Sequence, residues 1–186
     1  MPVQMAGSVA MGVVAAVVLW RMAGSWFKYR GNRLITCPEN RRPAGVRVNA
    51  RHAAATSLGH HLELRLSSCS RWPEKAGCGQ ECLHQVEASP QDCLVRNILA
   101  KWFEGKVCTV CGRPVGEIHE AGSQPALLGA DKVTVEWKQV PVDQLLDTLM
   151  VTEPVCFACH MAEILVREHP ELVVDRSRTL ATGNKL

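Results

Sequence analysis

The chain has 186 residues, nine of them cysteines, with a formal net charge of +3 and an aromatic content of 5%. Few aromatic side chains limit the size of a hydrophobic core, and so many cysteines indicate cross-linking by metal ions or disulfide bonds. The odd number of cysteines excludes complete disulfide pairing within one chain.

The N-terminal segment is the most apolar part of the chain. Residues 1–20 carry no charged side chain, and their length suits a helix that crosses a bilayer. Trp20 ends this segment and Trp26 follows it, at positions where interfacial aromatic residues are common. A secretory signal peptide fits less well, because the basic stretch follows the apolar segment instead of preceding it. We therefore predict a transmembrane anchor over residues 1–26.

Positive charge is concentrated directly after this segment. Residues 21–51 contain eight Lys and Arg residues against a single acid, Glu39. Because basic flanks remain in the cytoplasm, we expect a single-pass cell-membrane protein with its N-terminus outside and the bulk of the chain inside. Thiols stay reduced in that compartment, which favours metal binding over disulfides. The expected partners are membrane lipid and other membrane-protein subunits, with no nucleic acid and no small-molecule substrate.

The first half of the remaining chain mixes strands with loops. Two short strands are predicted around a turn at residues 37–40, and small polar residues predict a loop over 52–60. Apolar and polar side chains alternate over residues 61–67, which predicts a half-buried strand. A helix is predicted over residues 89–105, with a serine cap and a proline at its start and a glycine at its end.

The second half has a different order of elements. A turn at residues 108–112 comes first, and a β-hairpin is predicted over residues 126–137. Short helices are expected over residues 141–150 and over 152–170, the second of which carries another cysteine pair.

Two Cys-x-x-Cys turns separated by about 45 residues are the strongest chemical signal in the sequence. Each turn presents two thiolates to one ion, and two such turns complete a tetrahedral zinc site with Zn–S distances of about 2.3 Å. The predicted ligands are Cys108, Cys111, Cys156 and Cys159. The order of turn, hairpin and helix resembles the treble-clef class of zinc fingers over residues 106–170. That resemblance implies a fold and says little about activity.

The other cysteines allow a second site. Cys78 and Cys82 lie one helical turn apart, Cys37 lies in a strand-turn knuckle, and Cys69 ends the alternating strand. These four thiols are candidates for zinc or for an iron–sulfur cluster, which uses the same ligands. Cys93 is expected to be a buried apolar residue.

Two other chemistries remain open. The string Cys156-x-x-Cys159-His160 is the attachment motif of c-type haem, which would make the protein an electron carrier. The 106–170 segment also looks partly like HNH nucleases, with His119 as the candidate catalytic residue. Their usual paired histidine or aspartate is missing, and the segment is net acidic, which is unfavourable for binding nucleic acid.

We therefore predict an α+β protein with one N-terminal transmembrane helix followed by small metal-stabilised units. Its expected function is that of a membrane-anchored zinc-binding scaffold or accessory subunit, and not of an enzyme, because zinc held by four thiolates has no open position for a substrate. The predicted boundaries are 1–26 for the anchor, 27–51 for a basic segment with the first strands, 33–105 for the first cysteine-rich unit, 106–170 for the second, and 171–186 for the tail.

Overall fold

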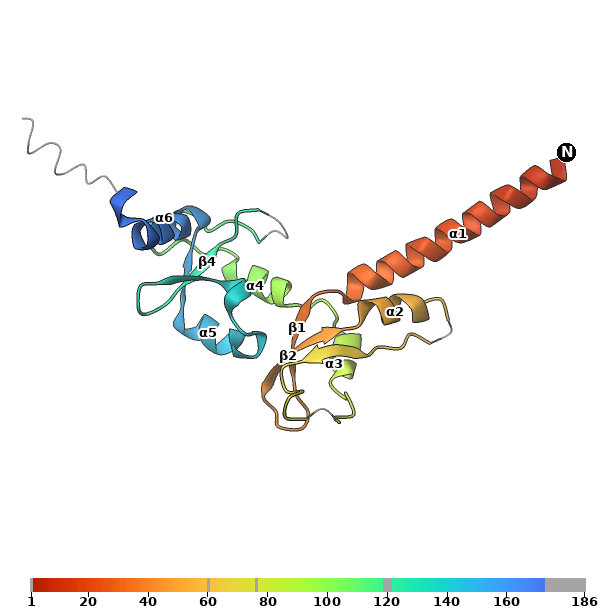
Figure 1. The fold of residues 1–186 in the computed structure, drawn as a ribbon, viewed down its shortest axis with the longest axis horizontal. Coiled ribbons are helices and arrows are strands. Elements are labelled where there is room, and N and C mark those ends of the chain that lie inside the picture. The colour runs from red at the N-terminus through yellow and green to blue at the C-terminus, as the bar shows by residue number, and fades with distance from the viewer. Residues whose placement is uncertain (1, 60, 76, 119–121, 173–186) are drawn as a thin grey trace, which may run out of the picture. The chain divides into compact units, whose positions relative to one another are not determined.

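The chain is α+β, with small sheets. The computed structural model describes residues 2–59, 61–75, 77–118 and 122–172, and within these ranges it describes the side chains of residues 11–171. Its strands form two three-stranded sheets (Figure 1). The chain divides into two compact units, which we call unit 1 (Met1–Leu99 with Pro141–Gln144) and unit 2 (Ala100–Val140 with Leu145–Leu186).

Unit 1 contains a long helix, an antiparallel sheet and several short helices. Its sheet has the strand order β1-β2-β3, with Val46 of the central strand opposite Arg33 on one side and Cys69 on the other. The elements are α1 (Pro2–Tyr29), β1 (Asn32–Thr36), β2 (Pro43–Val48), α2 (Ala50–Thr56), β3 (Leu66–Cys69), α3 (Leu83–Ala88), the start of α4 (Val95–Phe103) and the 3-10 turn η2 (Val142–Gln144).

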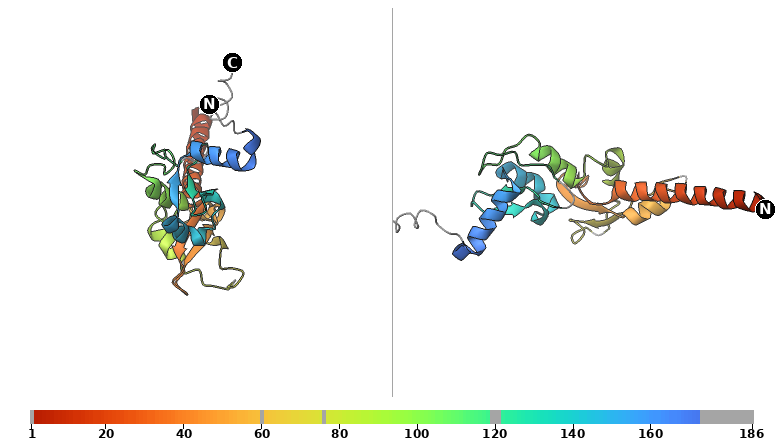
Figure 2. Two further views of the ribbon diagram at one scale, coloured as in Figure 1. Left: turned by 90° about the vertical axis from the view of Figure 1, so that its left-hand side faces the viewer. Right: turned by 90° about the horizontal axis from the view of Figure 1, so that it is seen from above.

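The side chains of Ser25 and Arg33 fix the end of α1. The helix lies along α2 near its C-terminus (Figure 2), where the Ser25 hydroxyl donates to the Ala53 carbonyl at 3.1 Å. Arg33 is fully buried, and its guanidinium donates to the carbonyls of Lys28 at 2.6 Å and Tyr29 at 2.8 Å. A cation on the last carbonyls of a helix satisfies acceptors that have no partner within the helix.

Unit 2 is built around a short, fully buried strand. In its antiparallel sheet β4 lies between β5 and β6, so that Leu127 faces Val135 on one side and Pro154 on the other. Leu127 is 1% exposed and forms part of a core with Leu145 and Val155. The elements are β4 (Ala126–Leu128), β5 (Thr134–Glu136), the 3-10 turn η1 (Trp137–Gln139), α5 (Leu145–Val151), β6 (Glu153–Val155), α6 (Phe157–Glu168) and the 3-10 turn η3 (Pro170–Leu172).

Several sequence-based boundaries differ from the structure. The predicted loop over 52–60 contains most of α2, which starts at Ala50 behind the Asn49 side chain, an acceptor for the His52 backbone N–H. The strand predicted over 61–67 forms only from Leu66 onward. The helix expected from residue 89 begins at Val95, and residues 153–155 form a third strand instead of the first turn of a helix.

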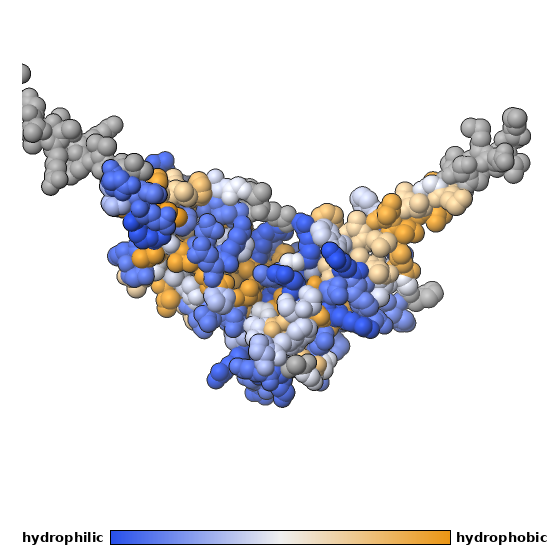
Figure 3. All heavy atoms as spheres, viewed as in Figure 1, coloured by the Kyte–Doolittle hydropathy of each residue, from blue (hydrophilic) through white to orange (hydrophobic). Residues whose placement is uncertain are grey.

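The predicted membrane anchor is wrong. The N-terminal segment forms the helix α1, and apolar side chains between Met11 and Trp20 are exposed on it (Figure 3). Arg21 and Lys28 are also exposed on this helix and interrupt its apolar run. Among the described residues, no helix is long and apolar enough to cross a membrane. This finding overturns the prediction of a transmembrane helix. The predicted single-pass location and orientation, which were inferred from that helix, are overturned with it.

Candidate metal centre

The first cysteine pair of unit 2 lies in a tight turn. The Cys108 backbone N–H donates to the Arg113 carbonyl, and the Gly112 N–H donates to the Cys108 carbonyl, both at 2.8 Å. Gly112 has a φ of 70°, a left-handed conformation that is accessible to glycine at little cost. This backbone directs the side chains of Cys108 and Cys111 to the same side of the turn.

The second pair lies where β6 runs into α6. Cys156 is the N-cap of α6 in an extended conformation, and its carbonyl accepts the backbone N–H of His160 at 3.0 Å. Cys159 follows in the first helical turn. The Thr109 N–H donates to the Pro154 carbonyl at 3.0 Å. This bond joins the turn at residues 108–112, which we call the knuckle of unit 2, to β6, the strand that precedes α6.

The two pairs converge on one point. Every sulfur of Cys108, Cys111, Cys156 and Cys159 lies within 4.8 Å of the others, and the Cys111 and Cys156 sulfurs are 3.7 Å apart. A tetrahedral zinc ion with Zn–S bonds of about 2.3 Å separates its sulfurs by about 3.8 Å. The observed spacing therefore fits a single tetrahedral ion held by four thiolates.

The electrostatics of the cluster favour a cation at its centre. Burial raises the pKa of Cys108, but backbone N–H groups of Cys156, Cys111 and Val110 donate to its sulfur and lower the pKa to about 6. Burial and the neighbouring thiols together raise the pKa of Cys159 to about 12. Four adjacent sulfurs cannot all ionise without a compensating positive charge, and a divalent ion supplies that charge.

His160 faces a different environment from its two neighbouring cysteines. It is 3% exposed, and its Nδ1 lies 2.6 Å from the Thr134 hydroxyl, which donates to Glu163 at 2.6 Å. Its Nε2 is buried without a hydrogen-bond partner, 3.9 Å from Glu136. His160 is thus a core residue that fastens α6 to β5. The sequence did not indicate this Thr134–His160–Glu163 cluster, because the three residues come together only through the packing of α6 on β5.

The other predicted site residues have different outcomes. The second predicted ligand set lies in unit 1 and comprises Cys37, Cys69, Cys78 and Cys82. Within the described part of the chain, the sulfurs of this set do not gather as closely as those of unit 2. The four cysteines line a common cavity instead. His119, the residue on which the nuclease alternative depends, lies outside the described residues.

No protein-family model matches the sequence, and no curated protein or solved structure shows significant similarity to it. The functional conclusion therefore depends on the geometry of the cysteines.

Proposed function

We propose that unit 2 is a treble-clef-like module that binds one zinc ion through Cys108, Cys111, Cys156 and Cys159, and that this ion has a structural role. The convergence of four sulfurs from two distant segments of the chain carries this proposal. The order of knuckle, hairpin and metal-bearing helix supports the treble-clef assignment. All four coordination positions are filled by protein, so the ion organises a surface and leaves no position for a substrate.

The spacing of the sulfurs favours a single ion over the electron-carrier alternatives. A polynuclear iron–sulfur cluster holds its cysteine sulfurs farther apart than a single tetrahedral ion does. A covalently attached haem would need both Cys156 and Cys159 as thioethers, which removes them as ligands and leaves Cys108 and Cys111 without a function. The protein therefore fits a zinc-stabilised scaffold that presents its surface to another macromolecule.

Metal content and colour test this proposal directly. We expect full-length protein purified under reducing conditions to be colourless and to contain tightly bound zinc. Replacing Cys156 with serine should remove that ion, whereas Cys93→Ser, a change outside both cysteine sets, should retain it. A Soret band or a brown chromophore that contains iron would contradict the proposal and identify an electron carrier.

A further inference from the structure

Unit 1 contains a second copy of the turn that holds the first cysteine pair of unit 2. Residues 37–43 read Cys-Pro-Glu-Asn-Arg-Arg-Pro, and residues 108–114 read Cys-Thr-Val-Cys-Gly-Arg-Pro. Cysteine, arginine and proline occupy the first, sixth and seventh positions of both segments. The residue before each cysteine pairs with the final proline, as Thr36 with Pro43 and as Val107 with Pro114.

The backbones of the two turns agree in detail. The Cys37 N–H donates to the Arg42 carbonyl at 2.9 Å and the Arg41 N–H to the Cys37 carbonyl at 2.8 Å, the same two bonds that close the knuckle of unit 2. Arg41 has a φ of 56° at the position that Gly112 occupies with 70°. A non-glycine residue adopts this conformation at a cost, so the surrounding structure maintains the knuckle shape without a glycine.

The turn at residues 37–43 supplies one thiol, whereas the turn at residues 108–114 supplies two. Asn40 stands where unit 2 has Cys111, and its side chain accepts the Arg42 backbone N–H at 3.1 Å, which turns it back onto its own loop. The other three ligands must therefore come from elsewhere in unit 1.

The Cys37 sulfur lies in a setting that stabilises a thiolate. The Arg71 guanidinium donates to it at 3.0 Å. Backbone N–H groups of Glu39 and Asn40 also face this sulfur. Amide donors around the sulfur also mark Cys108 in the knuckle of unit 2.

Three further thiols lie around the same cavity. It has a volume of about 300 Å³, and Cys37, Cys69, Cys78 and Cys82 all line it. Cys82 is buried, and the other three sulfurs are its neighbours. Trp72 also lines the cavity, and its indole N–H is buried without a hydrogen-bond partner, so it is a donor available to a thiolate.

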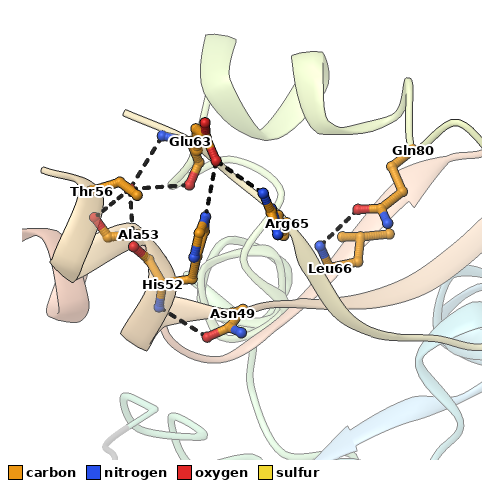
Figure 4. Close-up of polar contacts among 8 residues, drawn as sticks. All are labelled: Asn49, His52, Ala53, Thr56, Glu63, Arg65, Leu66 and Gln80. Atoms are coloured by element: carbon orange, nitrogen blue, oxygen red, sulfur yellow. Dashed lines mark hydrogen bonds and ion pairs between the residues drawn. The ribbon is translucent and has the colours of Figure 1, made fainter. Parts of the chain in front are cut away.

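Two glutamine side chains hold the cysteine-bearing segments together. Gln80, between Cys78 and Cys82, accepts the Leu66 backbone N–H of β3 at 2.9 Å (Figure 4). Gln85 of α3 both donates to the Thr36 carbonyl at 2.6 Å and accepts its N–H at 3.0 Å. Gln80 thereby fastens the loop before α3 to the start of β3, and Gln85 fastens α3 to the end of β1, next to Cys37.

We propose that Cys37, Cys69, Cys78 and Cys82 bind a second structural zinc ion in unit 1, independently of the centre in unit 2. Their sulfurs lie farther apart than those of unit 2, so binding draws them inward. Gly77 and Gly79 flank Cys78 and give its backbone the freedom to move toward the other three sulfurs. An ion here ties the knuckle, the end of β3 and the start of α3 together.

The stoichiometry of Co²⁺ and Zn²⁺ binding to the full-length, fully reduced protein tests this site. We expect two equivalents of Co²⁺ to bind with thiolate-to-cobalt charge-transfer absorption, and both to be displaced by Zn²⁺. Cys37→Ser and Cys78→Ser should each remove one equivalent and leave the other. Cys156→Ser should remove the other equivalent, so failure at one centre is distinguished from failure at the other. Cys93→Ser is the matched control and should retain both.

A wild-type protein that binds a single equivalent, lost in Cys156→Ser and unchanged in Cys37→Ser, would overturn the proposal. A disulfide among these four cysteines, detected by mass in protein purified under reducing conditions, would overturn it as well. If the serine variants do not fold, the metal stoichiometry of the wild-type protein and a count of its zinc-protected thiols still test whether the second site exists. Eight protected thiols support the second centre, and four exclude it.

Discussion

At the scale of single residues, position in the fold separates two neighbours in the Cys-x-x-Cys-His string. The Cys159 side chain points to the other thiols, whereas the His160 ring is buried against Thr134. In a helix, consecutive side chains diverge by about 100°, so neighbours face different surroundings. The histidine that suggested haem ligation therefore belongs to the core.

Replacing His160 with alanine should lower stability without removing the metal. The change creates a cavity and leaves the buried Thr134 hydroxyl with one partner fewer, so we expect a loss of about 2 kcal/mol in the free energy of unfolding. Denaturant unfolding and zinc analysis of the same sample measure both effects. His84→Ala, at an exposed side chain, is the control and should change stability by about 0.5 kcal/mol or less. If His160→Ala lost zinc while its fold remained intact, the result would show that this histidine is a metal ligand.

At the scale of elements, the knuckles show how a backbone shape can be preserved with different residues. Unit 2 uses Gly112 at the left-handed position, and unit 1 uses Arg41 there. Hydrogen bonds at both ends of each turn hold that position in place. The turn is consequently a property of the whole segment and not of one glycine.

Gly112→Ala should destabilise the zinc-loaded protein by about 1–2 kcal/mol. An added Cβ meets no atom within 4 Å, so the cost comes from the left-handed backbone alone. Gly112→Asn should cost less, because asparagine tolerates this conformation better than alanine. Denaturant midpoints of the two variants and the wild type provide the comparison. Equal midpoints for alanine and glycine would show that the turn is not held at a positive φ.

At the scale of the whole molecule, small sheets and short helices leave little apolar area to stabilise each unit. The core strands of unit 2 have three residues each. Zinc binding in closed cysteine sites contributes about 10 kcal/mol or more near neutral pH, which is comparable with the entire stability of a typical domain. The metal is therefore expected to decide whether unit 2 is folded.

Removing zinc with a strong chelator should unfold unit 2. We expect limited proteolysis to cut within residues 106–170 after chelation, and zinc-loaded protein to resist the same protease. Restoring zinc under reducing conditions should restore resistance. Cys156→Ser should be cut in the presence or absence of chelator. A cleavage pattern unaffected by chelation would contradict a structural role for the metal.

The hairpin over residues 126–137 was predictable because its signals are local: short apolar segments on either side of a turn that contains glycine and aspartate. Features that depend on contacts between distant segments of the chain were not predictable. The small residues of α2 suggested a loop, yet they form a helix because α1 packs along them. The alternating residues before Leu66 suggested a strand, but β2 offers hydrogen-bonding partners only from Leu66 onward. The apolar N-terminal run suggested a membrane span, which the described part of α1 does not support.

The sequence by itself determined the chemistry of the site, because the spacing within each Cys-x-x-Cys turn depends only on local backbone geometry. Which thiols meet was decided by the tertiary structure. Pairing of β6 with β4, and of the knuckle with β6 through Thr109, brings Cys156 and Cys159 to Cys108 and Cys111 across about 45 residues. The same sequence contains a second knuckle at residues 37–43, which shares only a cysteine, an arginine and a proline with residues 108–114, whereas the backbones of the two turns form the same hydrogen bonds. A turn is defined by its backbone, and different side chains can produce the same one.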